Sequence, residues 1–242
     1  MTLLAPLRGA AYLWRGFKLI GEASLRRYVI APLIINTALF IGLIWYGADK
    51  FANFIDSLLP SWLDWLQWLL WPLFAVTVLI AAFYTFTIVA NFIASPFYSL
   101  LASKVERRLS TEPITETSFA IVESLIHEAK KMLFLLGWAV PLGILFLIPG
   151  LNLLAPFAWL VFSVWMLVLE YCDYPMGNHG IPFHDQRRIV RGRTFLSLGF
   201  GTATLLATGI PIVNLFAIPA AVAGATALWF ENLQHGAVDE RQ

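Results

Sequence analysis

Two adjacent arginines stand directly before a long uncharged stretch of the sequence. Arg26 and Arg27 end the segment Ser24-Leu25-Arg26-Arg27, and residues 28–48, which follow, carry no charge. The N-terminus of a helix offers unpaired N–H groups and the positive end of the macrodipole. Together with two guanidinium groups and the N–H groups of Ser24 and Leu25, it forms a receptor for a small oxyanion. The alternative is that the arginines only anchor the chain at a membrane surface.

Composition places these arginines in an integral membrane protein. The 242 residues are 59% hydrophobic and only 13% charged, whereas soluble domains carry about 25% charged residues. Nothing indicates a separate soluble domain, so we expect a single membrane domain over residues 1–242. The single cysteine, Cys172, excludes an intramolecular disulfide, and no Cys/His cluster has zinc spacing. We therefore expect no metal and no cofactor.

The first half of the chain predicts three helical elements. Residues 5–21 read as an amphipathic helix on the membrane, since apolar and basic side chains fall on separate faces. Residues 28–48 are long enough to cross a hydrocarbon core of roughly 30 Å. Residues 49–64 read as a short acidic outer loop. Residues 70–103, from an uncharged run too long for one crossing, predict a long transmembrane helix that protrudes inward.

Two later uncharged runs, residues 132–169 and 194–230, share the phrase I-P-x-x-N-L-x-A near their middles. Each run is short for two crossings plus a turn, because two crossings need about 40 residues. We therefore expect two helical hairpins that enter and leave the membrane on the same side. Asn152 and Asn214 are expected to satisfy the backbone of the two turns. Two ordinary short spans in each run are the alternative.

The basic residues indicate the orientation of the chain. Of sixteen Lys and Arg residues, only Lys50 lies in the predicted outer loop. The others lie in the N-terminal segment, residues 104–131, residues 187–193 and the tail. By the positive-inside rule these segments, with both termini, face the cytoplasm.

The sequence offers no sign of enzymatic or coupled-transport chemistry. It lacks a P-loop, HExxH and GxSxG, so we expect no enzyme. His179 and His184, with Asp173 and Asp185, form either a loose metal or acid–base set or, as we favour, a solvated connector.

The uncharged runs contain no carboxylate or lysine, although proton or sodium coupling usually requires one. A passive route for an anion is then the simplest interpretation, if the protein moves a solute. Glu106, Arg107 and Arg108 are candidates to line such a route, with Asn36 and Asn91 from the predicted spans. A surface ion-pair network is the alternative for the three charged residues.

Taken in order, these motifs resemble the CysZ family of bacterial sulfate permeases, and the resemblance covers nearly the whole chain. The matching segments are Leu25-Arg26-Arg27 with Pro32-Leu33 and Asn36, Trp65-Leu66-Gln67-Trp68 with Leu70-Trp71-Pro72-Leu73, Ala90-Asn91 with Pro96-Phe97, Ile148-Pro149-Gly150, Tyr171-Cys172-Asp173-Tyr174-Pro175 with Asn178-His179 and Pro182-Phe183, and Asn214-Leu215-Phe216 with Pro219 and Gly224-Ala225-Thr226.

The resemblance implies an all-α inner-membrane protein that admits sulfate for cysteine biosynthesis. It implies two long transmembrane helices, two hemi-penetrating hairpins and a homo-oligomer in the lipid bilayer, with no nucleic-acid partner. It also implies sulfate binding at a Gly-Leu-Arg motif, which places Ser24, Leu25, Arg26 and Arg27 at the site. Ser24 replaces the glycine of that motif. The alternative function is a non-transporting membrane scaffold that partners a separate transporter.

Overall fold

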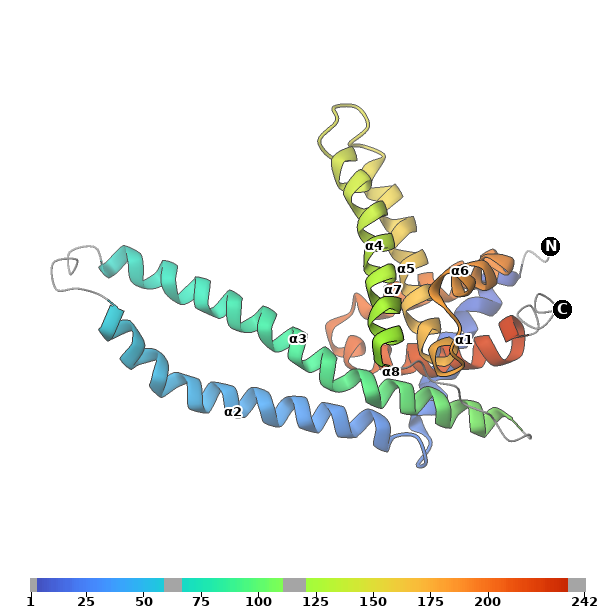
Figure 1. Ribbon diagram of the computed structural model, residues 1–242, viewed down its shortest axis with the longest axis horizontal. Helices are drawn as coiled ribbons and strands as arrows, with labels where there is room; N and C mark the ends of the chain where they lie inside the picture. Colours follow the sequence, from blue (N-terminus) through green and yellow to red (C-terminus); the bar gives the residue numbers. More distant parts are fainter. Residues whose placement is uncertain (1–3, 59–66, 111–120, 235–242) are drawn as a thin grey trace. The chain divides into compact units, whose positions relative to one another are not determined.

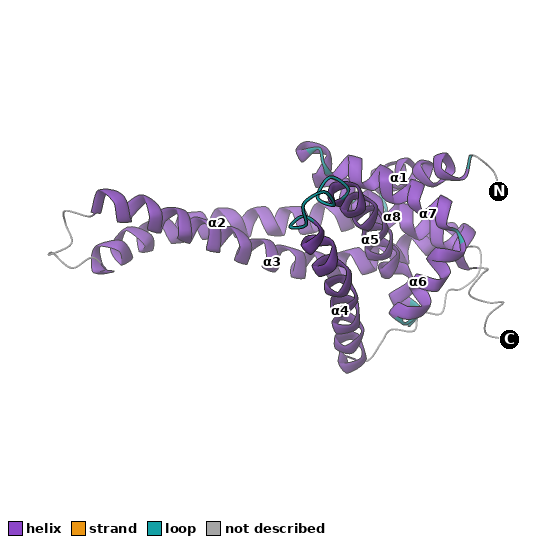
Figure 2. Cartoon of the chain, turned by 90° about the horizontal axis from the view of Figure 1, so that it is seen from above, coloured by secondary structure: helices purple, strands orange, loops and turns teal. Residues whose placement is uncertain are grey.

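The computed structural model describes residues 4–58, 67–110 and 121–234, and every regular element in these ranges is helical (Figure 2). The chain forms two compact units. One consists of Met1–Val29 with Tyr98–Gln242, and the other is Ile30–Phe97. The first unit contains the Ser24–Arg27 segment and both predicted hairpins, so it is the unit that matters most for the site.

Two long helices, α2 (Arg27–Leu58) and α3 (Gln67–Leu109), supply the second unit and run in opposite directions (Figure 1). Helix α2 contains residues 49–58, so the predicted acidic loop is wrong over that stretch. The charges there interrupt the apolar run, but no proline or glycine breaks the helix before Pro60. The remainder of that loop, residues 59–66, lies outside the described residues.

Helix α3 is longer than the predicted span 70–103. It has 43 residues, which corresponds to about 64 Å at 1.5 Å per residue. Its last turn contains Arg107 and Arg108, whose positive charges complement the negative end of the helix dipole. The prediction that this helix continues beyond the apolar run is confirmed.

Helix α1 (Ala5–Gly21) has the bounds predicted for the amphipathic helix, but it is an internal packing element. It lies against α7 (Thr194–Thr208) and α8 (Pro211–Leu228). Tyr12 also donates a hydrogen bond to Glu231 at 2.9 Å, and Arg15 pairs with the same carboxylate at 2.6 Å. The predicted apolar stripe therefore packs largely against protein.

Glycines bring α1 and α8 into close contact. A Cβ atom on Gly16 would overlap the carbonyl oxygen of Ala220, and one on Gly224 would overlap the carbonyl oxygen of Tyr12. Small residues at such crossings let two backbones approach closely, which is a common device between helices in membranes. Close approach at Gly16 therefore fixes α1 against the body of this unit.

We expect Gly16→Ala to destabilise the protein by about 1–3 kcal/mol, the usual cost of overpacking. The added methyl group meets backbone, which cannot move aside as a side chain can. Thermal unfolding in detergent measures the effect. Gly21→Ala is the matched control on the same helix, because a Cβ there meets nothing within 4 Å. Equal midpoints for both variants would contradict the close packing.

The run 132–169 forms a helix–turn–helix, as predicted, with α4 (Ile121–Leu145) and α5 (Ala155–Asn178) as its legs. Local backbone bonds satisfy the turn, including Asn152 N–H to Ile148 O at 3.0 Å. Gly150 has a φ of 86°, which glycine adopts readily. The side chain of Asn152 makes no hydrogen bond within the described part of the chain, so its predicted role is wrong.

The run 194–230 also forms a helix pair, α7 and α8, and a π-helical segment, Trp229–Leu233, follows it. Here the shared phrase begins a helix, with Pro211 as its first residue, whereas in the first run it lies mostly in the turn. The Asn214 side chain likewise makes no hydrogen bond among the described residues. Helix α7 has 15 residues, about 22 Å, which is too short to cross a bilayer core of about 30 Å.

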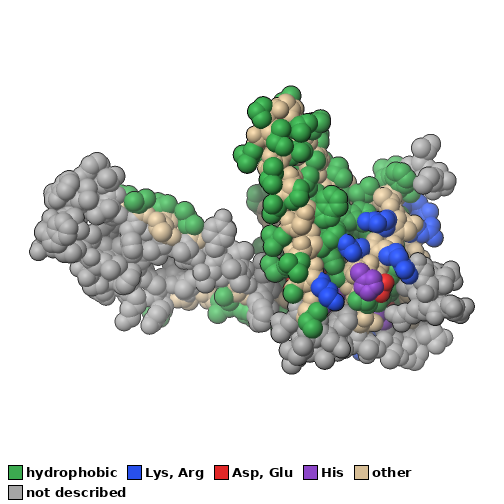
Figure 3. Space-filling model, turned by 45° about the horizontal axis from the view of Figure 1, so that its top comes forward, with side chains coloured by type: hydrophobic (Ala, Val, Ile, Leu, Met, Phe, Trp, Pro, Cys, Tyr) green, Lys and Arg blue, Asp and Glu red, His purple; other side chains and the backbone are tan. Residues whose placement is uncertain are grey.

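The α4–α5 hairpin exposes an apolar surface (Figure 3). At its tip Leu147 is 80% exposed, and at the tip of the other hairpin Ile212 is 83% exposed. Among the described residues, Ala155–Asn178 and Pro211–Leu233 are long and apolar enough to cross a membrane. Apolar surface of this extent indicates contact with lipid or with another protein. Whether the hairpins cross fully or return stays a prediction.

Candidate functional site

The predicted anion receptor is a tight turn between α1 and α2. Helix α1 ends at Gly21, and α2 begins at Arg27, so Arg26 immediately precedes the helix, as the sequence indicates. Leu25 is only 2% exposed and anchors the turn in the apolar core. The carbonyl oxygen of Glu22 accepts the N–H groups of Leu25 at 3.0 Å and Arg26 at 2.9 Å. The buried leucine and these two bonds determine where the arginines emerge.

Both arginine side chains of the turn are exposed. The Arg26 side chain has no ion pair or hydrogen bond to any described residue. The Arg27 guanidinium lies 5.0 Å from the centroid of the Tyr28 ring and donates to its hydroxyl at 3.2 Å. Stacking on an aromatic ring leaves other guanidinium N–H groups available. Two cationic groups are therefore accessible to an anion at the start of α2.

The backbone donors differ from those expected. The N–H of Leu25 is already bonded to Glu22, so it does not point at a ligand. Among the backbone bonds of the described turn, neither Ser24 nor Arg27 donates its N–H. The donors available beside the two guanidinium groups are therefore those of Ser24 and Arg27, together with the exposed Ser24 hydroxyl.

Of the three charged residues predicted at the end of α3, Arg108 reaches the turn. Its Nε lies 3.4 Å from the Glu22 carboxylate. This carboxylate is a feature that the sequence reasoning missed, because it competes with an anion for cationic groups. Glu106 is only 1% exposed and bonds to His179 at 2.7 Å, so it does not face solvent. Arg107 is exposed.

The two predicted pore-lining amides belong to the second unit. Asn36 is half-buried on α2. The side chain of Asn91 on α3 lies outside the described residues. Their role beside a sulfate path stays a prediction.

Asp173 is the centre of a buried polar network, so its interpretation as part of a solvated connector is wrong. It lies within α5, and it accepts hydrogen bonds from Lys131 Nζ at 2.9 Å and Gln186 Nε2 at 2.8 Å. His127 Nε2 lies 3.0 Å from Asp173 Oδ1. These contacts join α4, α5 and α6 (Phe183–Gly192). No local pattern predicts this network, since Lys131 and Asp173 are 42 positions apart.

Lys131 pairs with three carboxylates, those of Glu170 at 2.8 Å, Asp173 at 2.9 Å and Glu128 at 3.9 Å. Burial lowers the pKa of its amine, but the charges of Asp173 and Glu170 outweigh burial and raise that pKa above its usual value. The amine therefore stays protonated at neutral pH, and its ion pairs connect α4 to α5.

The other predicted polar residues also make structural contacts. Besides the His179–Glu106 bond, Asn178 donates to the carbonyl oxygen of Ser99 and to the hydroxyl of Ser103, both at 3.0 Å. These bonds tie the end of α5 to the end of α3. His184 pairs with Asp185, at 3.1 Å on the surface. Within the described residues, no three His, Cys, Asp or Glu side chains are grouped as a metal site.

The turn and the network both lie inside a region shared with known proteins. A family model described as "Sulfate transporter CysZ/Etoposide-induced protein 2.4" matches residues 12–219. The matched region extends from α1 into α8 and so includes the arginine turn, both long helices and the first hairpin entirely.

Proposed function

Because the chain belongs to the sulfate transporter CysZ/etoposide-induced protein 2.4 family, we propose that it is a sulfate permease. It passes sulfate through the bacterial inner membrane by a passive, channel-like route and supplies cysteine biosynthesis. The observation that carries this proposal is the exposed arginine pair at the start of α2. The Arg26 guanidinium has no partner among the described residues, and that of Arg27 is held by stacking on Tyr28.

The chemistry of the turn suits a divalent oxyanion. Sulfate accepts hydrogen bonds on every oxygen, and charge-assisted bonds from guanidinium groups are about twice as strong as neutral ones. The Ser24 hydroxyl and the N–H groups of Ser24 and Arg27 supply further, neutral donors in the turn. The positive end of the α2 dipole adds further attraction for an anion.

The charge distribution supports a cytoplasmic location for this turn and for both termini. A site on that side receives or regulates sulfate rather than selecting it from outside. The exposed apolar hairpins support insertion into lipid and assembly as a homo-oligomer, since a single copy leaves them uncovered.

Flux of labelled sulfate into liposomes containing only the purified protein tests the proposed transport. We expect uptake that follows the sulfate gradient and does not change when a pH gradient is imposed, because the predicted spans contain no ionisable coupling group. Empty liposomes provide the control. Absence of uptake together with retained sulfate binding would instead favour the scaffold that partners a separate transporter.

A further inference from the structure

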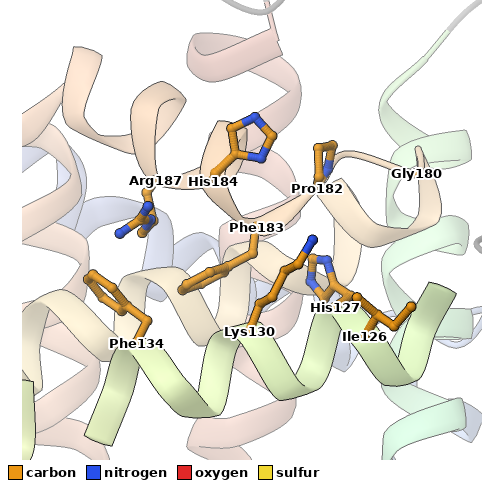
Figure 4. Close-up of a pocket in the computed structure, with 9 residues that line it drawn as sticks. All are labelled: Ile126, His127, Lys130, Phe134, Gly180, Pro182, Phe183, His184 and Arg187. Carbon is orange, nitrogen blue, oxygen red and sulfur yellow. The ribbon is translucent and has the colours of Figure 1, made fainter. Parts of the chain in front are cut away.

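A basic cavity lies in the first unit, and none of its lining residues belongs to the arginine turn. Its volume is about 490 Å³, and it lies between α4 and the segment that leads from α5 into α6 (Figure 4). Lys130, His184 and Arg187 supply its basic lining, and Phe134 and Phe183 its aromatic lining. No carboxylate lines the cavity among the described residues.

Lys130 and Arg187, the two permanently charged residues of the lining, are available to a ligand. Lys130 is exposed and has no ion pair or hydrogen bond to a described residue. The Arg187 guanidinium lies 4.3 Å from the Phe134 ring centroid and 5.4 Å from that of Phe183. Its Nε is buried and has no hydrogen-bond partner. A buried donor without a partner is costly, so an anion that reaches Arg187 would relieve this cost.

The nearby carboxylates do not neutralise these cations. Asp173 does not line the cavity and is already paired with His127, Lys131 and Gln186. Asp185 pairs with His184 at the surface. Lys130 and Arg187 therefore keep their charge for a ligand.

An apolar cavity adjoins the basic one and shares Phe134 and Arg187 with it. Its volume is about 390 Å³, and it is lined from α4, α5 and α6, with Arg191 beside Arg187 at its α6 wall. Trp138, Phe162 and Trp165 line it. A cationic cavity that adjoins an aromatic groove is complementary to an amphiphile with an anionic head. Inorganic sulfate has no apolar part that could occupy the groove.

We propose that these joined cavities bind one anionic phospholipid. Its phosphate lies between Lys130 and Arg187, and an acyl chain occupies the groove beside Trp138. The basic residues of this region face the cytoplasm by the charge distribution, where the leaflet carries anionic lipids and each nearby Lys or Arg contributes about 1 kcal/mol of attraction. Figure 3 shows Lys and Arg side chains beside the hydrophobic surface of the α4–α5 hairpin, as a lipid in this position requires.

Native mass spectrometry of the full chain in detergent tests the proposal. The protein is titrated with dioleoylphosphatidylglycerol or, in parallel, with dioleoylphosphatidylcholine. We expect the anionic lipid to bind at least about 10-fold more tightly, since the two cations attract its net negative charge and phosphatidylcholine carries none. Equal affinity for the two lipids would overturn the proposal, and this comparison needs no variant.

The variant Lys130→Gln/Arg187→Gln should remove the preference for phosphatidylglycerol. Arg8→Gln/Lys18→Gln is the matched control, because it removes the same charge from exposed positions on α1 and should keep the preference. A preference that survives in the Lys130/Arg187 variant would refute the site.

A third arm adds inorganic sulfate to the lipid complex of the unaltered protein. We expect millimolar sulfate to leave phosphatidylglycerol bound, because it cannot occupy the groove. Displacement of the lipid by sulfate at that concentration would reassign the cavity to a free anion. The outcome is independent of flux, so it stands or fails separately from the proposed transport.

Discussion

Replacing Arg26 and Arg27 together by alanine is expected to weaken sulfate binding by more than about 100-fold while the protein stays folded. A hydrogen bond to a charged group contributes about 1.5–3 kcal/mol, so the loss of two guanidinium partners removes at least about 3 kcal/mol. Both side chains are exposed, and neither supports the core. Calorimetric titration of the purified protein with sulfate measures the loss.

The single variants separate the roles of the two arginines. The Arg26 side chain has no described partner, so Arg26→Ala should affect binding alone. Arg27 stacks on Tyr28 and bonds to its hydroxyl, so Arg27→Ala also releases the tyrosine. Arg27→Lys keeps the charge but loses the planar fork, and should restore only part of the affinity.

Arg8→Ala/Lys18→Ala controls for net charge, because both residues are exposed on α1, before the turn. This control should bind sulfate as the unaltered protein does. Unchanged sulfate affinity in the Arg26/Arg27 variant would show that the turn is only a membrane anchor. An equal loss in the control would point to general electrostatic attraction rather than a site.

The largest effect on stability is expected from Asp173→Ala. The substitution removes the acceptor shared by Lys131 and Gln186 and the partner of His127. Removing one member of a buried ion pair typically costs about 3–5 kcal/mol, because the remaining charge is left uncompensated. A lowered unfolding midpoint in detergent, with loss of the monodisperse peak in size-exclusion chromatography, is the measurement.

Asp185→Ala is the matched control for this substitution. It removes the same charge from a surface pair with His184, and exposed pairs contribute about 0–1 kcal/mol. The two variants should therefore differ by several degrees in unfolding midpoint. Similar midpoints would mean that the network contributes no more than a surface pair.

The helices themselves were largely predictable. Helix α1 has the expected bounds, and both later runs form helix pairs near the shared phrase, because apolar periodicity, glycine and proline act on neighbouring residues. The exception is residues 49–58, where the charged residues wrongly predict the end of a helix. A helix ends where its backbone bonds fail, and isolated charges do not break them.

The sequence by itself determined the arginine pair, its place at the start of a helix and the family of the chain, since each of these depends on contiguous residues. Only the tertiary structure decided that Leu25 N–H is occupied, that Glu106 is buried against His179, and that Arg187 has an unbonded Nε. Asp173 acquires its partners from α4 and α6 only through helix packing. Polar groups distant in the sequence pair according to how helices pack, and side-chain packing leaves no local signature in the chain.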